Sequence, residues 1–151
     1  CGRCGLMKAG CQTPVMPVAG AGRRRVLFVG EYPGPKEDAA GRPFVGGSGR
    51  LLRAELAALG FDLDRDGWAT NALRCADPNR RNPKTAVADC RPHLIRTIDE
   101  LRPNAVVLLG GAALQSLVGA AWKPDVGPLG RWTGRLIPCQ KPNAWVAPLW
   151  N

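Results

Sequence analysis

The sequence has no unbroken apolar run long enough to cross a membrane. The candidate, residues 105–122, is interrupted by Gly110 and Gly111 and carries Gln115 and Ser116 in its second half. The first residues lack the continuous apolar segment of a secretory signal, and the chain has neither internal repeats nor low-complexity tracts. These absences argue against a membrane protein and favour a cytoplasmic protein with no membrane partner.

Acidic residues are also scarce. The chain has 12 Asp and Glu against 21 Lys and Arg, which gives a net charge of +9. Basic residues cluster at positions 23–25 and 79–84. Such clusters predict a polyanionic partner, with nucleic acid first. The alternative is a basic, solvated surface that has no such partner.

The composition excludes extended disorder, because 45% of the residues are hydrophobic and 22% are charged, as in ordinary globular proteins. A length of 151 residues is sufficient for one sizeable core. We therefore expect a single domain over residues 1–151, present as a monomer.

Strand and helix patterns alternate along the chain. Apolar runs predict four strands, at residues 25–29, 67–71, 105–110 and 144–150. Apolar positions at the helical period predict helices at residues 48–59, from Thr85 to before Pro103, and from the third strand to about Val118. This order predicts an α/β fold, with a mainly parallel four-stranded sheet covered by helices on both faces.

The segments that follow the predicted strands carry polar residues and glycines. The first strand leads into "GEYPG", in which proline and glycine shape a turn that presents Glu31 beside Gly30. Asn71 ends the second strand, and Asn151 follows the fourth. Because ligands bind at the carboxyl ends of parallel strands, these residues predict a site at one rim of the sheet.

Two side chains suit the recognition of a base. Phe44 lies in a loop of small residues, and an exposed ring there can stack on a base, while the amides of Gly47 and Ser48 at a helix start can hold a phosphate. The carboxamide of Asn71 matches the adjacent N–H and carbonyl of a pyrimidine edge. A core Phe and an Asn that ties a loop are the alternatives.

The chain is too large to need a disulfide scaffold, so its six cysteines are expected to be reduced thiols. Cys1 and Cys4 have the spacing with which two thiolates chelate one metal centre, and Cys75 and Cys90 form a second pair. The spacing leaves zinc and an iron–sulfur cluster open. Cys90 as a core residue and Cys75 as a loop thiol are further alternatives. The remaining two cysteines, either of which can replace one of these four, are Cys11 and Cys139.

Five motifs in order, "CGRC", "GEYPG..ED", "GRPFVGGSGRLL", "TNALRC" and "NRRNP......C", resemble those of the iron–sulfur uracil-DNA glycosylases, family 4 and its relatives. The resemblance runs from Cys1 to about Gly111. It implies a three-layer α/β/α fold and hydrolysis of the N-glycosidic bond of deoxyuridine in DNA, the first step of base excision repair. It also implies a [4Fe–4S] cluster on Cys1, Cys4, Cys75 and Cys90.

The resemblance further implies roles for single residues. The equivalent of Phe44 stacks on the flipped uracil, that of Asn71 reads its edge, and that of Glu31 lies beside the reacting sugar and water. Backbone amides of the turn at Gly30 can contact the base. Candidates for DNA phosphate contacts lie on the loop between the later cysteines: Arg80, Arg81 and Lys84. A solvated basic loop is the alternative.

Two positions depart from the family pattern. Tyr32 stands where the family has a small or polar residue, which leaves the excised base open. Asn151 stands where the family has a catalytic histidine; the chain's only histidine, His93, is expected to be structural. Because family members continue into a further helix, we expect the natural chain to extend beyond Asn151. A non-catalytic DNA-binding relative and a redox-sensing thiol or cluster protein are the rival functions.

Overall fold

A computed structural model describes residues 1–77, 84–121, 126–141 and 143–151. Its sheet has five strands in the order β2-β1-β3-β5-β4. Four of them pair in parallel: β1 (Val26–Gly30), β2 (Gly67–Asn71), β3 (Ala105–Leu109) and β5 (Ala144–Leu149). The fifth, β4 (Ile137–Cys139), runs antiparallel to β5 at the edge of the sheet.

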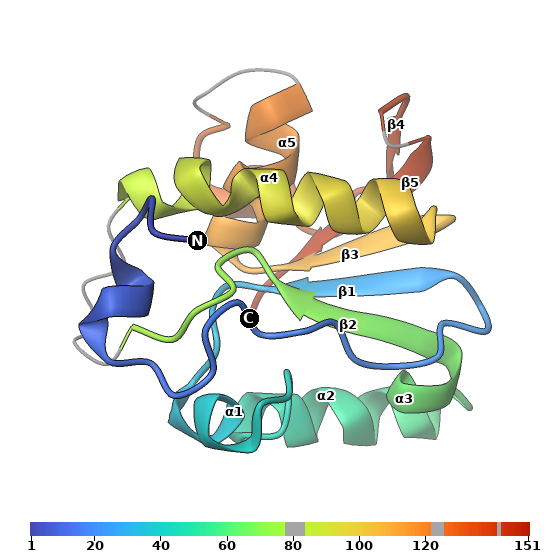
Figure 1. Cartoon of the computed structure of the whole chain (residues 1–151). Coiled ribbons are helices and arrows are strands. Elements are labelled where there is room, and N and C mark those ends of the chain that lie inside the picture. Colours follow the sequence, from blue (N-terminus) through green and yellow to red (C-terminus); the bar gives the residue numbers. More distant parts are fainter. Residues whose placement is uncertain (78–83, 122–125, 142) are drawn as a thin grey trace.

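Helices cover both faces of this sheet (Figure 1). One face carries α1 (Pro35–Ala40), α2 (Gly47–Ala58) and α3 (Leu63–Asp66). The opposite face carries α4 (Lys84–Leu101) and α5 (Gly111–Ala121). Two short 3-10 turns complete the described elements, η1 (Leu6–Ala9) and η2 (Leu129–Arg131). The predicted three-layer α/β/α fold is confirmed. No helix in these four ranges is long and apolar enough to span a membrane.

The central strands are buried on both faces, which is why they read as continuous apolar runs. Leu27 and Val29 of β1 belong to the core that lies under α4 and α5, whereas Phe28 packs with Leu63 and Ala69 on the other face. The predicted apolar face of α4 is confirmed. Leu94 and Ile98 belong to the first of these cores, Val87 and Leu101 pack against it, and Cys90 is buried.

The predicted strand count of four was wrong. β4 has only three residues with Pro138 in the middle, and it becomes a strand by pairing with β5. Such a short segment carries no periodic pattern of its own. The predicted helix at 48–59 agrees with α2 within one residue at each end, but the inward position predicted for Leu59 was wrong, because this residue is 80% exposed.

Candidate active site

A cavity of about 310 Å³ lies at the carboxyl ends of β1 and β2, beside the start of α2. The structure brings eight of the predicted site residues together in its lining: Gly30, Glu31, Tyr32, Phe44, Gly47, Ser48, Asn71 and Asn151. They come from four segments of the chain that are distant in sequence. The rim that the strand order predicted is therefore a single concave site.

Glu31 is held at the floor of the site by the first turn of α5. Its Oε1 accepts a hydrogen bond from the backbone N–H of Ala112, at 2.9 Å. The positive end of the helix dipole favours a carboxylate at this place. Gly110 allows the close approach, because a Cβ there would lie 2.5 Å from Cγ of Glu31, and its φ of +101° also favours glycine.

Asn71 and Phe44 converge above the backbone of Gly30. A Cβ on Gly30 would lie 2.5 Å from Oδ1 of Asn71 and 3.0 Å from Cζ of Phe44. Asn71 is only 5% exposed, so its carboxamide is a polar group inside a largely enclosed corner. An edge-reading amide and a flat ring around a glycine surface form a slot suited to a planar heterocycle.

The remaining cavity residues lie closer to solvent. Gly47 and Ser48 are exposed at the start of α2, where the first backbone N–H groups of a helix are free to bind an anion. Tyr32 is 36% exposed and also lines a neighbouring hollow, and Asn151 is exposed. The phenol therefore stands at the rim of the cavity.

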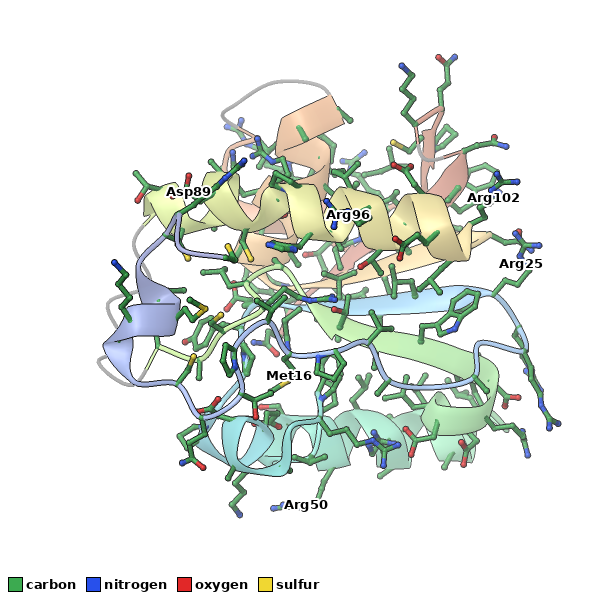
Figure 2. The ribbon with its side chains drawn as sticks, viewed as in Figure 1. Met16, Arg25, Arg50, Asp89, Arg96 and Arg102 are labelled. Atoms are coloured by element: carbon green, nitrogen blue, oxygen red, sulfur yellow. The ribbon has the colours of Figure 1, made fainter. Side chains whose placement is uncertain are left out.

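The predicted phosphate-binding loop cannot be placed. Arg80 and Arg81 lie outside the described residues, as does the side chain of Lys84, whose backbone begins α4. A second basic cluster is placed: Arg25 lies next to Arg102 at the amino ends of the strands, the end opposite to the cavity (Figure 2).

Five cysteines come from the N-terminal segment, the loop after β2 and α4, and sulfur atoms are seen between that segment and the start of α4 (Figure 2). Cys75 and Cys90 are buried and accept hydrogen bonds from the N–H groups of Val15 and Arg74, both at 3.3 Å. Burial and the neighbouring thiol of Cys75 raise the pKa of Cys11 to about 11.

The other predicted ligands are less enclosed. Cys4 is half-buried, while Cys1 is exposed. Burial raises the pKa of the Cys90 thiol, and the nearby thiol of Cys4 raises it further. Among the described residues, no three His, Cys, Asp or Glu side chains gather closely enough to hold a metal ion. Cys139 lies apart in sequence on β4, and its thiol donates to the carbonyl of Lys141 at 2.9 Å.

Arg74 supplies a test of whether an anionic group fits beside these thiols. Its side chain is buried, at 8% exposed, and one guanidinium nitrogen donates to the hydroxyl of Thr70. Its Nε has no hydrogen-bond partner in the described part of the chain. Burial lowers the pKa of Arg74, and the thiols of Cys90 and Cys75 act in the opposite direction, more strongly than Glu100. A buried cation with an unused donor beside soft thiol ligands fits a thiolate-bound, negatively charged cluster.

His93 lies on α4 and not in the cavity lining. Burial and the positive charges of Arg74 and Arg96 lower its pKa. It stands on the cysteine side of the molecule. The structural role expected from the sequence stays a prediction.

Sequence reasoning gave no role to Gly110, Arg74 or Glu37. Glu37 lines the cavity and accepts hydrogen bonds from the loop that carries Phe44. A signal for it was present, because "ED" at residues 37–38 belongs to the second of the five motifs. The burial of Arg74 had no signal, since arginine in a polar loop is expected to face solvent.

The sequence that forms this fold and cavity matches a known superfamily. The profile of the Uracil DNA glycosylase superfamily matches residues 17–148, which covers the sheet up to the last residue of β5 and every residue of the cavity except Asn151. The chain belongs to the uracil-DNA glycosylase superfamily, and the resemblance drawn from its motifs is confirmed.

Individual relatives narrow the similarity to one branch. The chain is 40% identical over 116 residues to the type-4 uracil-DNA glycosylase of Archaeoglobus fulgidus, which covers 76% of this chain and 57% of that protein. It is also 40% identical over 123 residues to the type-4 enzyme of Pyrobaculum aerophilum, covering 79% and 61%. The matched region is thus little more than half of these relatives.

Proposed function

We propose that this chain is a DNA glycosylase that hydrolyses the N-glycosidic bond of uracil, or a related deaminated base, flipped out of DNA, and so begins base excision repair. The observation that carries the proposal is the convergence of Glu31, Phe44 and Asn71 on one cavity at the strand ends. The names of the relatives agree with it.

Recognition of the base rests on Phe44 and Asn71. The ring stacks on the flipped base, while the carboxamide donates to O4 of uracil and accepts from N3–H. Cytosine presents the inverse pattern at these two atoms. Because Asn71 is buried, water cannot satisfy the donors and acceptors that face each other when cytosine occupies the site. Cytosine is therefore rejected.

Bond cleavage rests on Glu31. As the C1′–N1 bond breaks, its electrons leave with the base and positive charge develops on the sugar. The carboxylate of Glu31 stabilises that charge and orients a water, whose oxygen then bonds to C1′ and whose proton ends on the departed base. The N–H of Ala112 keeps the carboxylate in one position, so it need not reorganise during the reaction.

The same proposal includes a [4Fe–4S] cluster bound by Cys1, Cys4, Cys75 and Cys90. Such a cluster, when bound, supplies a covalent cross-link between the N-terminal segment, the loop after β2 and α4. The buried thiols, the N–H donors to their sulfur atoms and the unused donor of Arg74 support it.

DNA enters the proposal through its phosphates. The free N–H groups at Gly47 and Ser48 hold a phosphate next to the flipped nucleotide, and Arg80, Arg81 and Lys84 contact others. We propose a monomer that acts in the cytoplasm on single- or double-stranded DNA, with no membrane partner. The net charge of +9 supports the choice of a polyanionic partner.

The direct test is incubation with oligonucleotides that contain a single uracil, hypoxanthine, xanthine or thymine, followed by alkaline cleavage of abasic sites. We expect excision of uracil and none of thymine. DNA binding without excision of any of these bases would overturn the enzymatic proposal and favour a non-catalytic relative. Iron and acid-labile sulfide are measured on the same preparation, and stoichiometric zinc without sulfide would exclude the cluster.

A further inference from the structure

The loop that carries Phe44 is held in a conformation it would not adopt unaided. Phe44 has a φ of +57°, in the left-handed region that residues with a side chain rarely occupy. Its carbonyl oxygen accepts a hydrogen bond from Nε of Arg53, at 3.0 Å. α2 also packs directly on it, since a Cβ on Gly49 would lie 2.2 Å from the carbonyl carbon of Phe44. The ring's position is therefore imposed by its surroundings.

Glu37 supplies the contacts on the other side of Phe44. Its Oε1 accepts hydrogen bonds from the N–H groups of both Val45, at 3.0 Å, and Gly46, at 2.5 Å. One carboxylate oxygen thus fixes two consecutive peptide units immediately after the aromatic residue. Charge-assisted bonds of this kind are stronger than neutral ones.

Two glycines border this carboxylate. A Cβ on Gly46 would lie 2.8 Å from Oε1 of Glu37, and a Cβ on Gly34 would lie 2.7 Å from its Oε2. Both glycines therefore permit backbone to approach the carboxylate from two sides. Gly34 belongs to the turn that also presents Glu31, so the carboxylate of Glu37 is wedged between the two loops of the cavity.

The helix that carries Glu37 is itself anchored. The next residue, Asp38, is buried and accepts from the N–H groups of Gln12 and Thr13, at 2.8 and 2.9 Å. The hydroxyl of Thr13 returns a bond to the carbonyl of Asp38 at 2.6 Å. Glu37 therefore projects from an anchored helix, and its hydrogen bonds fix the position of the Phe44 loop relative to that helix.

We propose that Glu37 is the positioning residue for the base-stacking ring, acting through Val45 and Gly46 and not on the substrate itself. This inference rests on the proposed function, because it assigns Phe44 to a flipped base. Oε1 of Glu37 is committed to two backbone N–H groups, and the carboxylate assigned to the reacting sugar and water is that of Glu31.

The experiment compares Glu37→Ala, Glu37→Gln, Phe44→Ala and the double variant Glu37→Ala/Phe44→Ala with the unaltered chain. Glu55→Ala, an exposed glutamate on α2, is the matched control. Affinity is measured for an oligonucleotide containing 2′-fluorinated deoxyuridine, whose glycosidic bond resists hydrolysis. Excision of uracil is measured under single-turnover conditions, with its pH profile.

We expect Glu37→Ala to weaken binding roughly tenfold, the scale of one lost stacking contact. The double variant should bind no worse than Phe44→Ala, because the two residues act as one unit. Glu37→Gln should retain most of the affinity, since a single amide oxygen can accept both N–H groups, and the pH profile should not change. A loss in Glu37→Gln equal to that in Glu37→Ala, or additive losses in the double variant, would overturn the proposal.

Amide hydrogen exchange separates this inference from the proposed function. In Glu37→Ala the amides of Val45 and Gly46 should exchange at least tenfold faster, while those of the control do not change. Absence of uracil excision by the unaltered chain refutes the proposed function. Unchanged exchange at these two amides refutes the role of Glu37, whatever the activity.

Discussion

The cavity and the cysteine region are both assembled from distant segments, but they are held together differently. In the cavity, the carboxylates of Glu31 and Glu37 accept hydrogen bonds from backbone N–H groups, and glycines allow side chains to approach the main chain closely. In the cysteine region, the buried thiols of Cys75 and Cys90 each accept one hydrogen bond from a backbone N–H group, and Cys1 is exposed. Contacts with the backbone therefore determine the geometry of the cavity. The geometry of the cysteine region depends instead on the thiol side chains and on the group that they bind.

The two regions share one segment. The N–H groups of Ala72 and Leu73 donate to the carbonyls of Gly30 and Glu31, at 2.8 and 2.9 Å. The same stretch begins with Asn71 in the cavity and ends at Cys75. A perturbation of the cysteines should therefore reach the cavity through this segment.

The largest expected effect is on the cysteine side. Cys75→Ser should lose all cluster iron, because a serine hydroxyl is a poor substitute for a thiolate ligand. Cys139→Ser is the control and should keep its iron, since a hydroxyl can still donate to the carbonyl of Lys141. Iron, sulfide and visible absorbance report the result. Full iron content in Cys75→Ser would remove this residue from the proposed ligands.

On the cavity side, Asn71→Asp should reduce uracil excision roughly 100-fold while leaving the iron content unchanged. A carboxylate cannot donate to O4 and repels the departing uracil anion. Asn104→Asp, at an exposed position, controls for the added charge. Single-turnover rates on uracil DNA provide the measurement, and equal rates in the two variants would mean that Asn71 does not read the base.

A smaller loss of excision activity is expected when Glu31 is kept but its side chain is moved. Gly110→Ala should slow excision ten- to a hundredfold, because the new Cβ would push Glu31 from its place. Gly134→Ala is matched in backbone geometry, with a φ of +78° against +101°, but would have open space around its Cβ. Both should lose about 1–2 kcal/mol of stability. Comparable excision by the two variants would show that Glu31 tolerates displacement.

The smallest effect is a gain at the rim. Asn151→His should raise excision about tenfold, because an imidazolium places positive charge beside the uracil anion and an amide does not. The gain should vanish above the pKa of the new histidine. A rate that is unchanged at all pH values would show that residue 151 does not approach the leaving base.

Sequence predicted much of the fold because its central strands are continuous apolar runs. Predicted and observed strands agree within one residue at 67–71, 105–110 and 144–150, and the apolar face of α4 lies where its period placed it. β4 was not predicted, because its pairing with β5 is a tertiary contact that no local pattern encodes. α3 could have been found, since Asp62 caps it by accepting from the N–H groups of Asp64 and Arg65.

For the site, sequence supplied the residues but not the contacts that fix them. Glu31 and Asn71 could be named because strand ends gather at one rim, and Phe44 because it lies in a loop of small residues before a helix. The roles of Gly110 and Glu37 depend on distances between segments that no local pattern encodes. The unused donor of Arg74 likewise appears only once the loop after β2 is seen to be buried.

The central claim is that uracil is excised in the cavity at the strand ends, with Glu31 at the reacting sugar. Its most direct test is the single-turnover excision rate of the unaltered chain and of Glu31→Gln, measured with equal, saturating enzyme. A glutamine can still accept from the N–H of Ala112 but carries no charge. We predict a rate at least 100-fold lower in Glu31→Gln, with binding of 2′-fluorinated deoxyuridine DNA within about threefold of the unaltered chain. Equal excision rates would contradict the account.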